Sequence, residues 1–378
     1  MTFSPTTRRV AAAFTAVLTL TGCNGLSTAT GTGTVAGAPA GGGGPTAGGR
    51  ATAARTDTDM SAVIQALSRL GAQPIELLST EQARSQPSFA DAYRRVLQDR
   101  GATMPGTNVR TTDLTIPGPS GIIPARLYRP PNARAGAPLI VYWHGGGWVI
   151  ADLNTYDASA RALAAETGAV VLSAHYRQGP ENHFPAAFDD AFATYRWALA
   201  NAHRLGASSR IAVAGESAGG ALALATTVAA RDARLSLPVH VALVYPVATT
   251  DTGTPSKGEN SSSIPLSSAG LQWFVDRFVR SPADLADPRL DPVRRGDLRG
   301  LPPMTIVNAE VDPLRSEGEA LARRLREAGV PVEQRTYEGV THEFFGMAPV
   351  VADATAAQAL VAGRLREALG RARSLAAR

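Results

Sequence analysis

Cysteine and lysine are almost absent from this chain of 378 residues, which contains one of each, Cys23 and Lys257. A single cysteine excludes an internal disulfide, so the cysteine content says nothing about the redox state of the compartment. The H-E-x-x-H pattern of zinc hydrolases is also missing, and the sequence predicts no metal site. The only glycine-rich loop beside a predicted strand fits a different role, described below, so we expect no nucleotide and no other cofactor.

Charged residues are also few, at 18% of the chain, and the basic residues behind the net charge of +5 are almost all arginine. A sequence pI of about 9.7 would suit a protein that binds nucleic acid or anionic membranes. Here, however, the arginines are scattered, and many stand beside acidic residues in predicted helices, as between Arg323 and Glu327. Solvated helix faces explain this pattern, so we predict no nucleic-acid partner.

The N-terminal apolar run is too short to span a membrane. It extends from Val10 to Leu20, about eleven residues, whereas a spanning helix needs about 20. Arg8 and Arg9 precede it, and small residues follow it. This order is typical of a secretory signal, and we predict a signal peptide over residues 1–22.

The end of this signal has a special form. Leu20-Thr21-Gly22-Cys23 resembles the lipobox of bacterial lipoproteins, in which the cysteine is lipidated and becomes the new N-terminus. By this resemblance Cys23 is the lipidation site, and the protein is exported and membrane-anchored on the periplasmic or cell-surface side. The alternative is an ordinary signal peptide and a secreted soluble protein. Residues 23–55 are mostly glycine, alanine and threonine, which predicts a flexible linker.

The body of the chain begins with helical patterns. Apolar residues recur at helical spacing over Met60–Leu70 and Phe89–Leu97, which predicts two helices within residues 56–110. Asp113–Ile116 and Ile122–Tyr128 then predict a hairpin.

Residues 111–378 continue as alternating strands and helices. We predict strands at Leu139–Trp143, Ala169–Ala174, Arg210–Ala214, Val239–Tyr245, Met304–Asn308 and Val332–Tyr337. We predict helices at Ala158–Glu166, Pro185–Leu205, Ala218–Arg231, Leu314–Ala328 and after Asp353. Such alternation indicates an α/β fold whose mostly parallel sheet is covered by helices on both faces.

One segment, Thr250–Pro303, interrupts this alternation. It is rich in serine, proline, aspartate and glycine, and it holds one amphipathic helix, roughly Ser268–Val279. The segment is either part of a lid over the sheet or a surface loop with a docked helix, and the sequence favours neither.

A candidate nucleophile stands between a predicted strand and a predicted helix. Gly215-Glu216-Ser217-Ala218-Gly219 matches the G-x-S-x-G pattern in the strand–turn–helix context of a nucleophile elbow. The turn is so tight that the positions two residues before and two residues after the serine have no room for a side chain, hence Gly215 and Gly219. Ser217 is therefore expected at the carboxyl end of the strand, where a helix N-terminus favours developing negative charge.

A second glycine motif supports this assignment. His144-Gly145-Gly146-Gly147 directly follows a predicted buried strand and matches the H-G-G-G oxyanion element of lipases and esterases. Consecutive glycines let backbone N–H groups point into a pocket. We expect His144 to form supporting hydrogen bonds rather than to react.

A serine nucleophile needs a base and an acid that orients the base. His342 follows the strand Val332–Tyr337, and Asp312 follows the strand Met304–Asn308, so both lie in loops at one edge of the sheet. The order Ser, Asp, His is the order of the α/β-hydrolase fold. Glu310 is the alternative to Asp312. The other candidates for the base are weaker, because none follows a late strand: His175, His183, His203 and His240.

Taken together, these motifs resemble those of the hormone-sensitive-lipase-like esterases. The resemblance extends over four blocks: His144–Trp148, Tyr176–Asp190, Gly215–Gly220, and Glu310–Gly318 with His342. It implies an α/β-hydrolase fold with a helical cap built from N-terminal helices and an insertion near residues 250–300. Two positions depart from the commoner pattern: Glu216 replaces Asp, and Arg177-Gln178-Gly179 replaces R-L-A.

The resemblance also implies residue roles. Asp312 is the triad acid, and the N–H groups of Gly146, Gly147 and Ala218 hold the oxyanion. Gly145 and Glu216 support them. The expected function is a serine carboxylesterase acting on small-molecule esters with short to medium acyl chains. The alternatives are an amidase or deacetylase with the same triad, and a non-catalytic ligand-binding lipoprotein. A homodimer through an edge strand or a helix pair is compatible with such folds.

Overall fold

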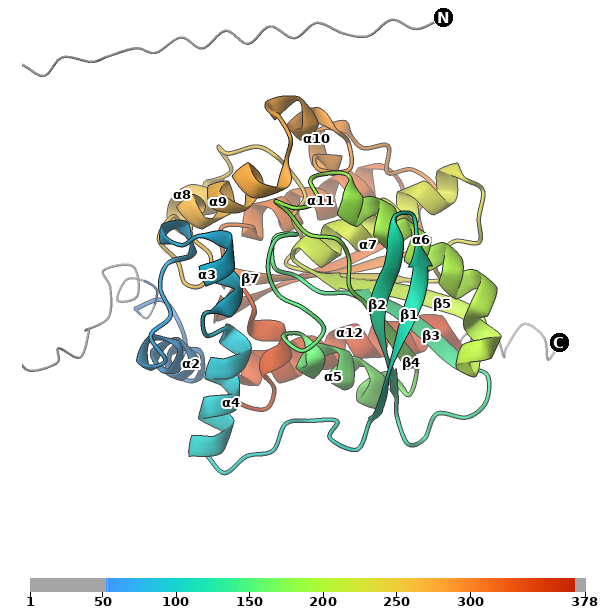
Figure 1. Ribbon diagram of the computed structural model, residues 1–378, viewed down its shortest axis with the longest axis horizontal. Coiled ribbons are helices and arrows are strands. Elements are labelled where there is room, and N and C mark those ends of the chain that lie inside the picture. Colours follow the sequence, from blue (N-terminus) through green and yellow to red (C-terminus); the bar gives the residue numbers. More distant parts are fainter. Residues whose placement is uncertain (1–51, 53, 371–378) are drawn as a thin grey trace, which may run out of the picture. The chain divides into compact units, whose positions relative to one another are not determined.

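A computed structural model describes residue 52 and residues 54–370 (Figure 1). The predicted signal peptide over residues 1–22, the lipidation residue Cys23 and most of the predicted linker to residue 55 lie outside the described residues. Within the described part, no helix is both long enough and apolar enough to cross a membrane.

The fold is built on one sheet of eight strands in the order β1-β2-β4-β3-β5-β6-β7-β8. β1 and β2 form an antiparallel hairpin that pairs antiparallel with β4, and all the later pairs are parallel. The predicted α/β class is therefore confirmed. The strands are β1 (Arg110–Gly118), β2 (Gly121–Arg129), β3 (Ala137–Trp143), β4 (Val170–Ala174), β5 (Ala207–Glu216), β6 (Val241–Val244), β7 (Met304–Val311) and β8 (Val332–Thr341).

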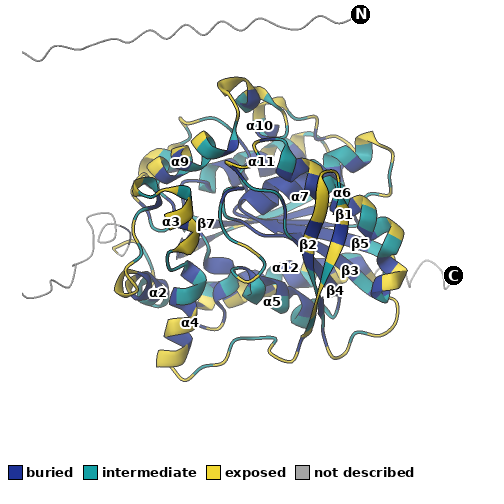
Figure 2. Cartoon of the chain, viewed as in Figure 1, coloured by how far each residue is buried: buried dark blue, intermediate teal, exposed yellow. Residues whose placement is uncertain are grey.

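Successive side chains of β3 enter two different cores. Leu139 and Val141 belong to the core on one face of the sheet, whereas Ile140 and Tyr142 belong to the core on the other. All four are buried because helices cover both faces, which is why the strand is an unbroken apolar run. Figure 2 shows buried residues gathered along the sheet and on the inner sides of the helices.

Two groups of helices supply these cores (Figure 1). The Leu139 face is covered by α6 (Ala186–Asn201), α7 (Ala218–Asp232) and α11 (Arg315–Glu327). The opposite face is covered by α5 (Asp157–Thr167), α12 (Ala352–Gly370), α2 (Thr58–Arg69) and α4 (Phe89–Asp99). The predicted helix Pro185–Leu205 is not continuous: α6 ends at Asn201, and the 3₁₀ turn η2 (Ala202–Leu205) follows.

The two segments expected to form the cap contact each other. The insertion holds α8 (Pro255–Glu259), α9 (Ser268–Phe278), η3 (Pro282–Ala286) and α10 (Pro292–Arg295), and the N-terminal segment adds η1 (Ile75–Leu77) and α3 (Thr80–Ser85). Trp273 Nε1 donates to the carbonyl oxygen of Leu78 at 2.9 Å, and Arg277 Nε donates to Thr80 Oγ1 at 3.1 Å. The insertion is thus hydrogen-bonded to the N-terminal segment, and its role as part of a lid stays a prediction.

Candidate active site

The candidate nucleophile lies in a sharp turn between β5 and α7. Ser217 has φ 54° and ψ −119°, a backbone conformation that costs a non-glycine residue free energy. The turn is tight: a Cβ on Gly215 would lie 2.1 Å from the Gly219 carbonyl oxygen, and a Cβ on Gly219 would lie 2.1 Å from that of Trp143. Both glycines are therefore required by the close approach of backbone.

Ser217, His342 and Asp312 form one hydrogen-bonded chain. His342 Nε2 lies 3.0 Å from Ser217 Oγ, and His342 Nδ1 lies 2.7 Å from Asp312 Oδ2. The structure thus brings together the three side chains that the sequence analysis assigned as base, nucleophile and acid. All three are buried, with Ser217 only 5% exposed and Asp312 fully enclosed.

The strand register explains why these residues meet. β7 and β8 are parallel neighbours, and Val311 pairs with Thr341, so the next residues, Asp312 and His342, leave the sheet side by side. β3 pairs with β5 through Trp143 and Gly215, which places the His144 loop beside Ser217. Carboxyl ends of parallel strands meet at one edge of a sheet, where α/β proteins bind their ligands.

The environment of His342 favours its protonated form. Burial alone would lower the pKa of His342, but the negative charge and the hydrogen bond of Asp312 more than offset that effect. Glu343 and Glu216 add smaller contributions, and the net result is a pKa above the usual value for histidine. Such a group is a strong base toward the hydroxyl of Ser217.

The Asp312 loop is fixed by contacts that the sequence analysis missed. Asp312 Oδ1 accepts the backbone N–H of Leu314 at 2.8 Å, and the Asp312 carbonyl oxygen accepts Asn260 Nδ2 at 3.0 Å. Asn260 is buried in the insertion and in turn accepts a hydrogen bond from Arg55 Nη1 at 2.6 Å. No motif marks Asn260, because its role depends on a fold that brings residues 260 and 312 together.

Glu310, the alternative acid, has other partners. Its Oε2 accepts the backbone N–H of Gly339 at 2.9 Å, and its Oε1 lies 3.8 Å from Arg55 Nη2. Asp312, not Glu310, contacts His342. The other candidate bases also point elsewhere: His240 Nε2 pairs with Thr305 Oγ1 at 2.9 Å, and His183 Nδ1 pairs with the Arg277 carbonyl oxygen at 3.1 Å.

The expected oxyanion residues lie near the nucleophile for two reasons. Ala218 follows Ser217 in the sequence, and Gly146 and Gly147 follow β3, which pairs with the strand that carries Ser217. Gly146 and Gly147 both have positive φ, 97° and 58°, directly after β3. Ala218 is the first residue of α7, and backbone N–H groups at a helix N-terminus lack partners within the helix. A Cβ on Gly147 would lie 2.2 Å from Cδ1 of Phe274, so the Phe274 ring of α9 packs directly on this loop.

His144 forms hydrogen bonds at the start of the predicted oxyanion loop. Its Nδ1 lies 2.7 Å from the Gly145 carbonyl oxygen, and its Nε2 lies 2.9 Å from His175 Nδ1. Burial, followed by the nearby His175, lowers the pKa of His144 to about 3, so the ring is neutral near pH 7. Tyr176 stacks on the ring and donates its hydroxyl to the Gly145 carbonyl oxygen at 2.9 Å. These contacts are compatible with the supporting role predicted for His144.

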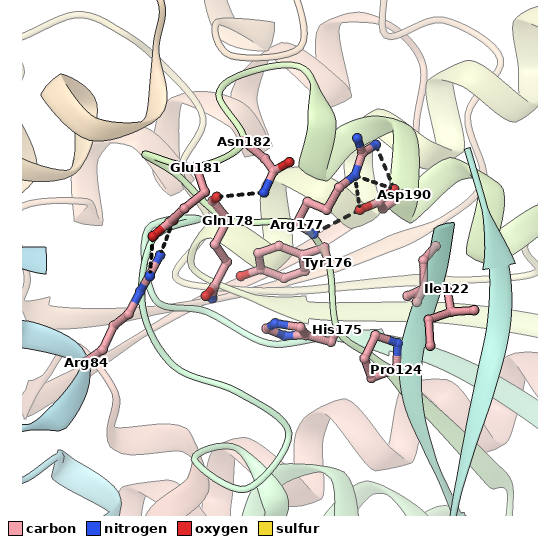
Figure 3. Close-up of a pocket in the computed structure, with 11 residues that line it drawn as sticks. Arg84, Ile122, Pro124, His175, Tyr176, Arg177, Gln178, Glu181, Asn182 and Asp190 are labelled. Carbon is pink, nitrogen blue, oxygen red and sulfur yellow. Dashed lines mark hydrogen bonds and ion pairs between the residues drawn. The ribbon is translucent and has the colours of Figure 1, made fainter. Parts of the chain in front are cut away.

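A separate cavity lies beside the loop that supports His144 (Figure 3). It has a volume of about 360 Å³, and its lining includes neither Ser217 nor His342. Its charged side chains are already paired, Arg84 with Glu181 at 2.8 Å and Arg177 with Asp190 at 2.9 Å.

Among the described residues, no group of three His, Cys, Asp or Glu could hold a metal ion.

Comparison with known proteins agrees with the class that the fold and the site define, a serine hydrolase. A model of a family described as having the α/β-hydrolase fold matches residues 140–346. The chain belongs to this family and, within it, to the hormone-sensitive-lipase-like esterases, as the sequence motifs indicated.

Several named relatives are esterases. Carboxylic ester hydrolase LipN of Mycobacterium tuberculosis is 43% identical over 65% of this chain and 67% of its own length. Esterase LipI of the same organism is 39% identical over 71% and 85%. Ethyl acetate hydrolase of Pseudomonas putida is 36% identical over 74% and 91%. Among solved structures, a hyperthermophilic esterase from Pyrobaculum calidifontis superposes with a TM-score of 0.72 at 36% identity, covering 80% of this chain and 96% of that one.

Proposed function

We propose that this protein is a serine carboxylesterase that hydrolyses esters with short to medium acyl chains through an acyl-enzyme on Ser217. The observation that carries the proposal is the continuous hydrogen-bonded chain from Asp312 through His342 to Ser217. The names of the relatives support ester rather than amide bonds, and ethyl acetate hydrolase supports a small acyl group.

The first half of the reaction forms the acyl-enzyme. His342 Nε2 takes the proton of Ser217 as Ser217 Oγ attacks the carbonyl carbon of the ester. The carbonyl oxygen becomes an oxyanion, which the backbone N–H groups of Gly146, Gly147 and Ala218 stabilise. When the intermediate collapses, the ester C–O bond breaks and the alcohol leaves with the proton from His342.

The second half releases the acid. A water molecule gives its proton to His342 and attacks the acyl carbon, and the same three N–H groups hold the second oxyanion. Collapse of this intermediate breaks the bond to Ser217 Oγ, which recovers its proton from the histidine. Asp312, hydrogen-bonded to His342 Nδ1, stabilises the imidazolium cation that forms in each half.

The acyl-chain preference is expected to depend on Phe274. Its half-buried ring packs on Gly147, beside the proposed oxyanion donors, and so occupies space that a long substrate would need. We expect Phe274→Ala to raise the ratio of kcat/KM for p-nitrophenyl octanoate over acetate by about 10-fold, because each methylene that fits a pocket contributes about 1 kcal/mol or more.

The measurement is a p-nitrophenyl ester series from acetate to palmitate. The matched control is Gln272→Ala, which shortens an exposed side chain of the same helix and should keep the wild-type chain-length profile. An unchanged profile in Phe274→Ala would show that this ring does not limit the acyl chain.

We also propose that the protein is exported and anchored to a membrane through lipid on Cys23. The supporting observations are the short apolar run, the two arginines before it and the Leu20–Cys23 sequence. In a bacterial host, Cys23→Ser should move the esterase activity from the membrane fraction to the soluble fraction and abolish incorporation of a labelled fatty acid. Retention of Cys23→Ser in the membrane fraction would contradict the anchor and leave the esterase proposal untouched.

A further inference from the structure

Two glutamates outside the triad are next to the triad in sequence. Glu216 immediately precedes Ser217, and Glu343 immediately follows His342. The reaction proposed above uses neither. Glu216 is 1% exposed and Glu343 is half-buried, although carboxylates are seldom buried without a partner that compensates their charge.

Both carboxylate oxygens of Glu216 accept hydrogen bonds from tyrosine hydroxyls. Tyr142 of β3 donates to Oε1 at 2.6 Å, and Tyr245, which follows β6, donates to Oε2 at 2.5 Å. Both tyrosines are fully buried. Burial raises the pKa of Glu216 to about 7, and the two hydrogen bonds act against that rise. The hydrogen bonds favour the ionised carboxylate and burial favours the protonated form, so Glu216 carries its negative charge mainly above about pH 7.

Glu343 is held in a similar way from another side. It has φ 74°, and its Oε1 accepts the hydroxyl of Tyr156, which precedes α5. The same hydroxyl lies 2.2 Å from where a Cβ on Gly145 would be, so it also packs against the start of the oxyanion loop. Burial raises the pKa of Glu343, and the charge of His342 lowers it.

One of these groups contacts the ring of the base directly. The Tyr245 ring lies 4.5 Å from the His342 ring, centroid to centroid, and connects it to Glu216. The ionisable and hydroxyl groups linked to the base by hydrogen bond, ring contact or sequence adjacency are Asp312, Ser217, Tyr245 and Glu343, and Tyr142, Tyr156 and Glu216 hydrogen-bond to members of this set.

We propose that Glu216 and Glu343 are positioning residues that act through His342, forming a second layer of negative charge that stabilises its imidazolium cation during catalysis. This inference rests on the proposed esterase function. Three tyrosine hydroxyls orient the layer, and Tyr156 connects it to the oxyanion loop. Asp312 supplies the direct hydrogen bond, and the two glutamates supply charge in a low-dielectric site, where charge acts over a longer range than in water.

The test is the pH profile of kcat/KM with a short-chain p-nitrophenyl ester, whose acid limb reports the pKa of the base in the free enzyme. Glu343→Gln and Glu216→Gln keep the shape of each side chain and remove its charge. Because a nearby negative charge raises the pKa of a histidine, Glu343→Gln should move the acid limb to lower pH by about half to one pH unit. Glu216→Gln should move it in the same direction by less, because Glu216 itself titrates near pH 7. Each should also lower kcat by about 3- to 10-fold, since the imidazolium loses stabilisation.

Asp291→Asn is the matched control. Asp291 is also fully buried, but it pairs with Arg294 and Arg295 in the insertion. The acid limb of the pH profile of Asp291→Asn should coincide with that of the wild type. Loss of packing alone would lower activity without moving the limb to lower pH, so the direction of the shift separates the charge from a structural effect.

Tyr156→Phe and Tyr245→Phe test the same two carboxylates if a glutamine variant fails to fold. Each removes one hydroxyl donor from a carboxylate, raises the pKa of that carboxylate and should shift the limb in the same direction by less. Acid limbs at the wild-type position in the folded variants would overturn the inference. A wild-type enzyme without turnover and without reaction of Ser217 with a fluorophosphonate would instead overturn the proposed function.

Discussion

Replacing Ser217 by alanine is expected to lower kcat/KM for p-nitrophenyl butyrate by at least about 10⁴-fold. The reason is that Ser217 Oγ is the only atom at this position that can form the acyl bond, and His342 Nε2, 3.0 Å away, has no other proton to take from residue 217. Alanine meets the same backbone strain at φ 54° as serine, so the variant should fold. Circular dichroism and a thermal melt will verify that point.

Ser208→Ala is the control for this variant. Ser208 lies on the same strand, β5, near its opposite end, and its hydroxyl oxygen accepts the backbone N–H of Arg210 at 3.3 Å. The half-buried Ser208 makes one weak contact away from the triad, so Ser208→Ala should retain wild-type kcat/KM within about twofold. Substantial turnover by Ser217→Ala would contradict the assignment of the nucleophile.

Replacing Asp312 by asparagine is expected to lower kcat by about 10³- to 10⁴-fold, the effect seen when a triad acid is neutralised. The carboxylate oxygen accepts the proton on His342 Nδ1 and so leaves Nε2 free to accept the proton of Ser217. An amide nitrogen at this position would donate to Nδ1 instead, which favours the tautomer with its proton on Nε2. That tautomer cannot act as the base.

Glu310→Gln tests whether Glu310 rather than Asp312 is the triad acid, a choice that the sequence alone left open. Glu310 lies two residues from Asp312 but hydrogen-bonds the backbone N–H of Gly339. Glutamine can accept that hydrogen bond, so Glu310→Gln should keep kcat within about threefold of the wild type. A loss in Glu310→Gln as large as that in Asp312→Asn would mean that Glu310 orients the base in solution.

The strand–helix order could be predicted from the sequence because the strands are buried on both faces. Leu139–Trp143 is an unbroken apolar run, and the structure places a strand at Ala137–Trp143. The ends of the functional strands were less predictable. β5 runs to Glu216 and β8 to Thr341, beyond the predicted ends at Ala214 and Tyr337, and the two extensions contain Gly215 and Gly339. Glycine is disfavoured in strands, so the sequence does not reveal that the sheet accommodates both residues.

The short elements of the cap could not be predicted for a different reason. α3 and α8 have six and five residues, too few for the helical periodicity that reveals longer helices. One local signal was available: Ser79 and Gln82 form a capping box at the start of α3. α9 is longer, and its predicted bounds differ from the observed ones by one residue at the C-terminal end.

Motifs located the residues of the site, but not the contacts among them. Ser217 and His144–Gly147 belong to local patterns with a fixed geometry, so their roles could be inferred from spacing. Asn260 and Phe274 belong to no pattern, because their contacts with Asp312 and Gly147 arise only from packing of the insertion. Glu343 was adjacent to His342 in the sequence, yet only the fold shows that it is enclosed with Tyr156.

The most direct test of the central claim is the reaction of the wild-type protein with a fluorophosphonate, followed by peptide mass mapping and by turnover of p-nitrophenyl esters. We expect one label per chain, on Ser217, with loss of esterase activity in proportion to labelling and no label in Ser217→Ala. A protein that folds but neither binds the label nor hydrolyses any ester from acetate to palmitate would contradict it. The intact triad would then belong to a binding protein rather than an enzyme.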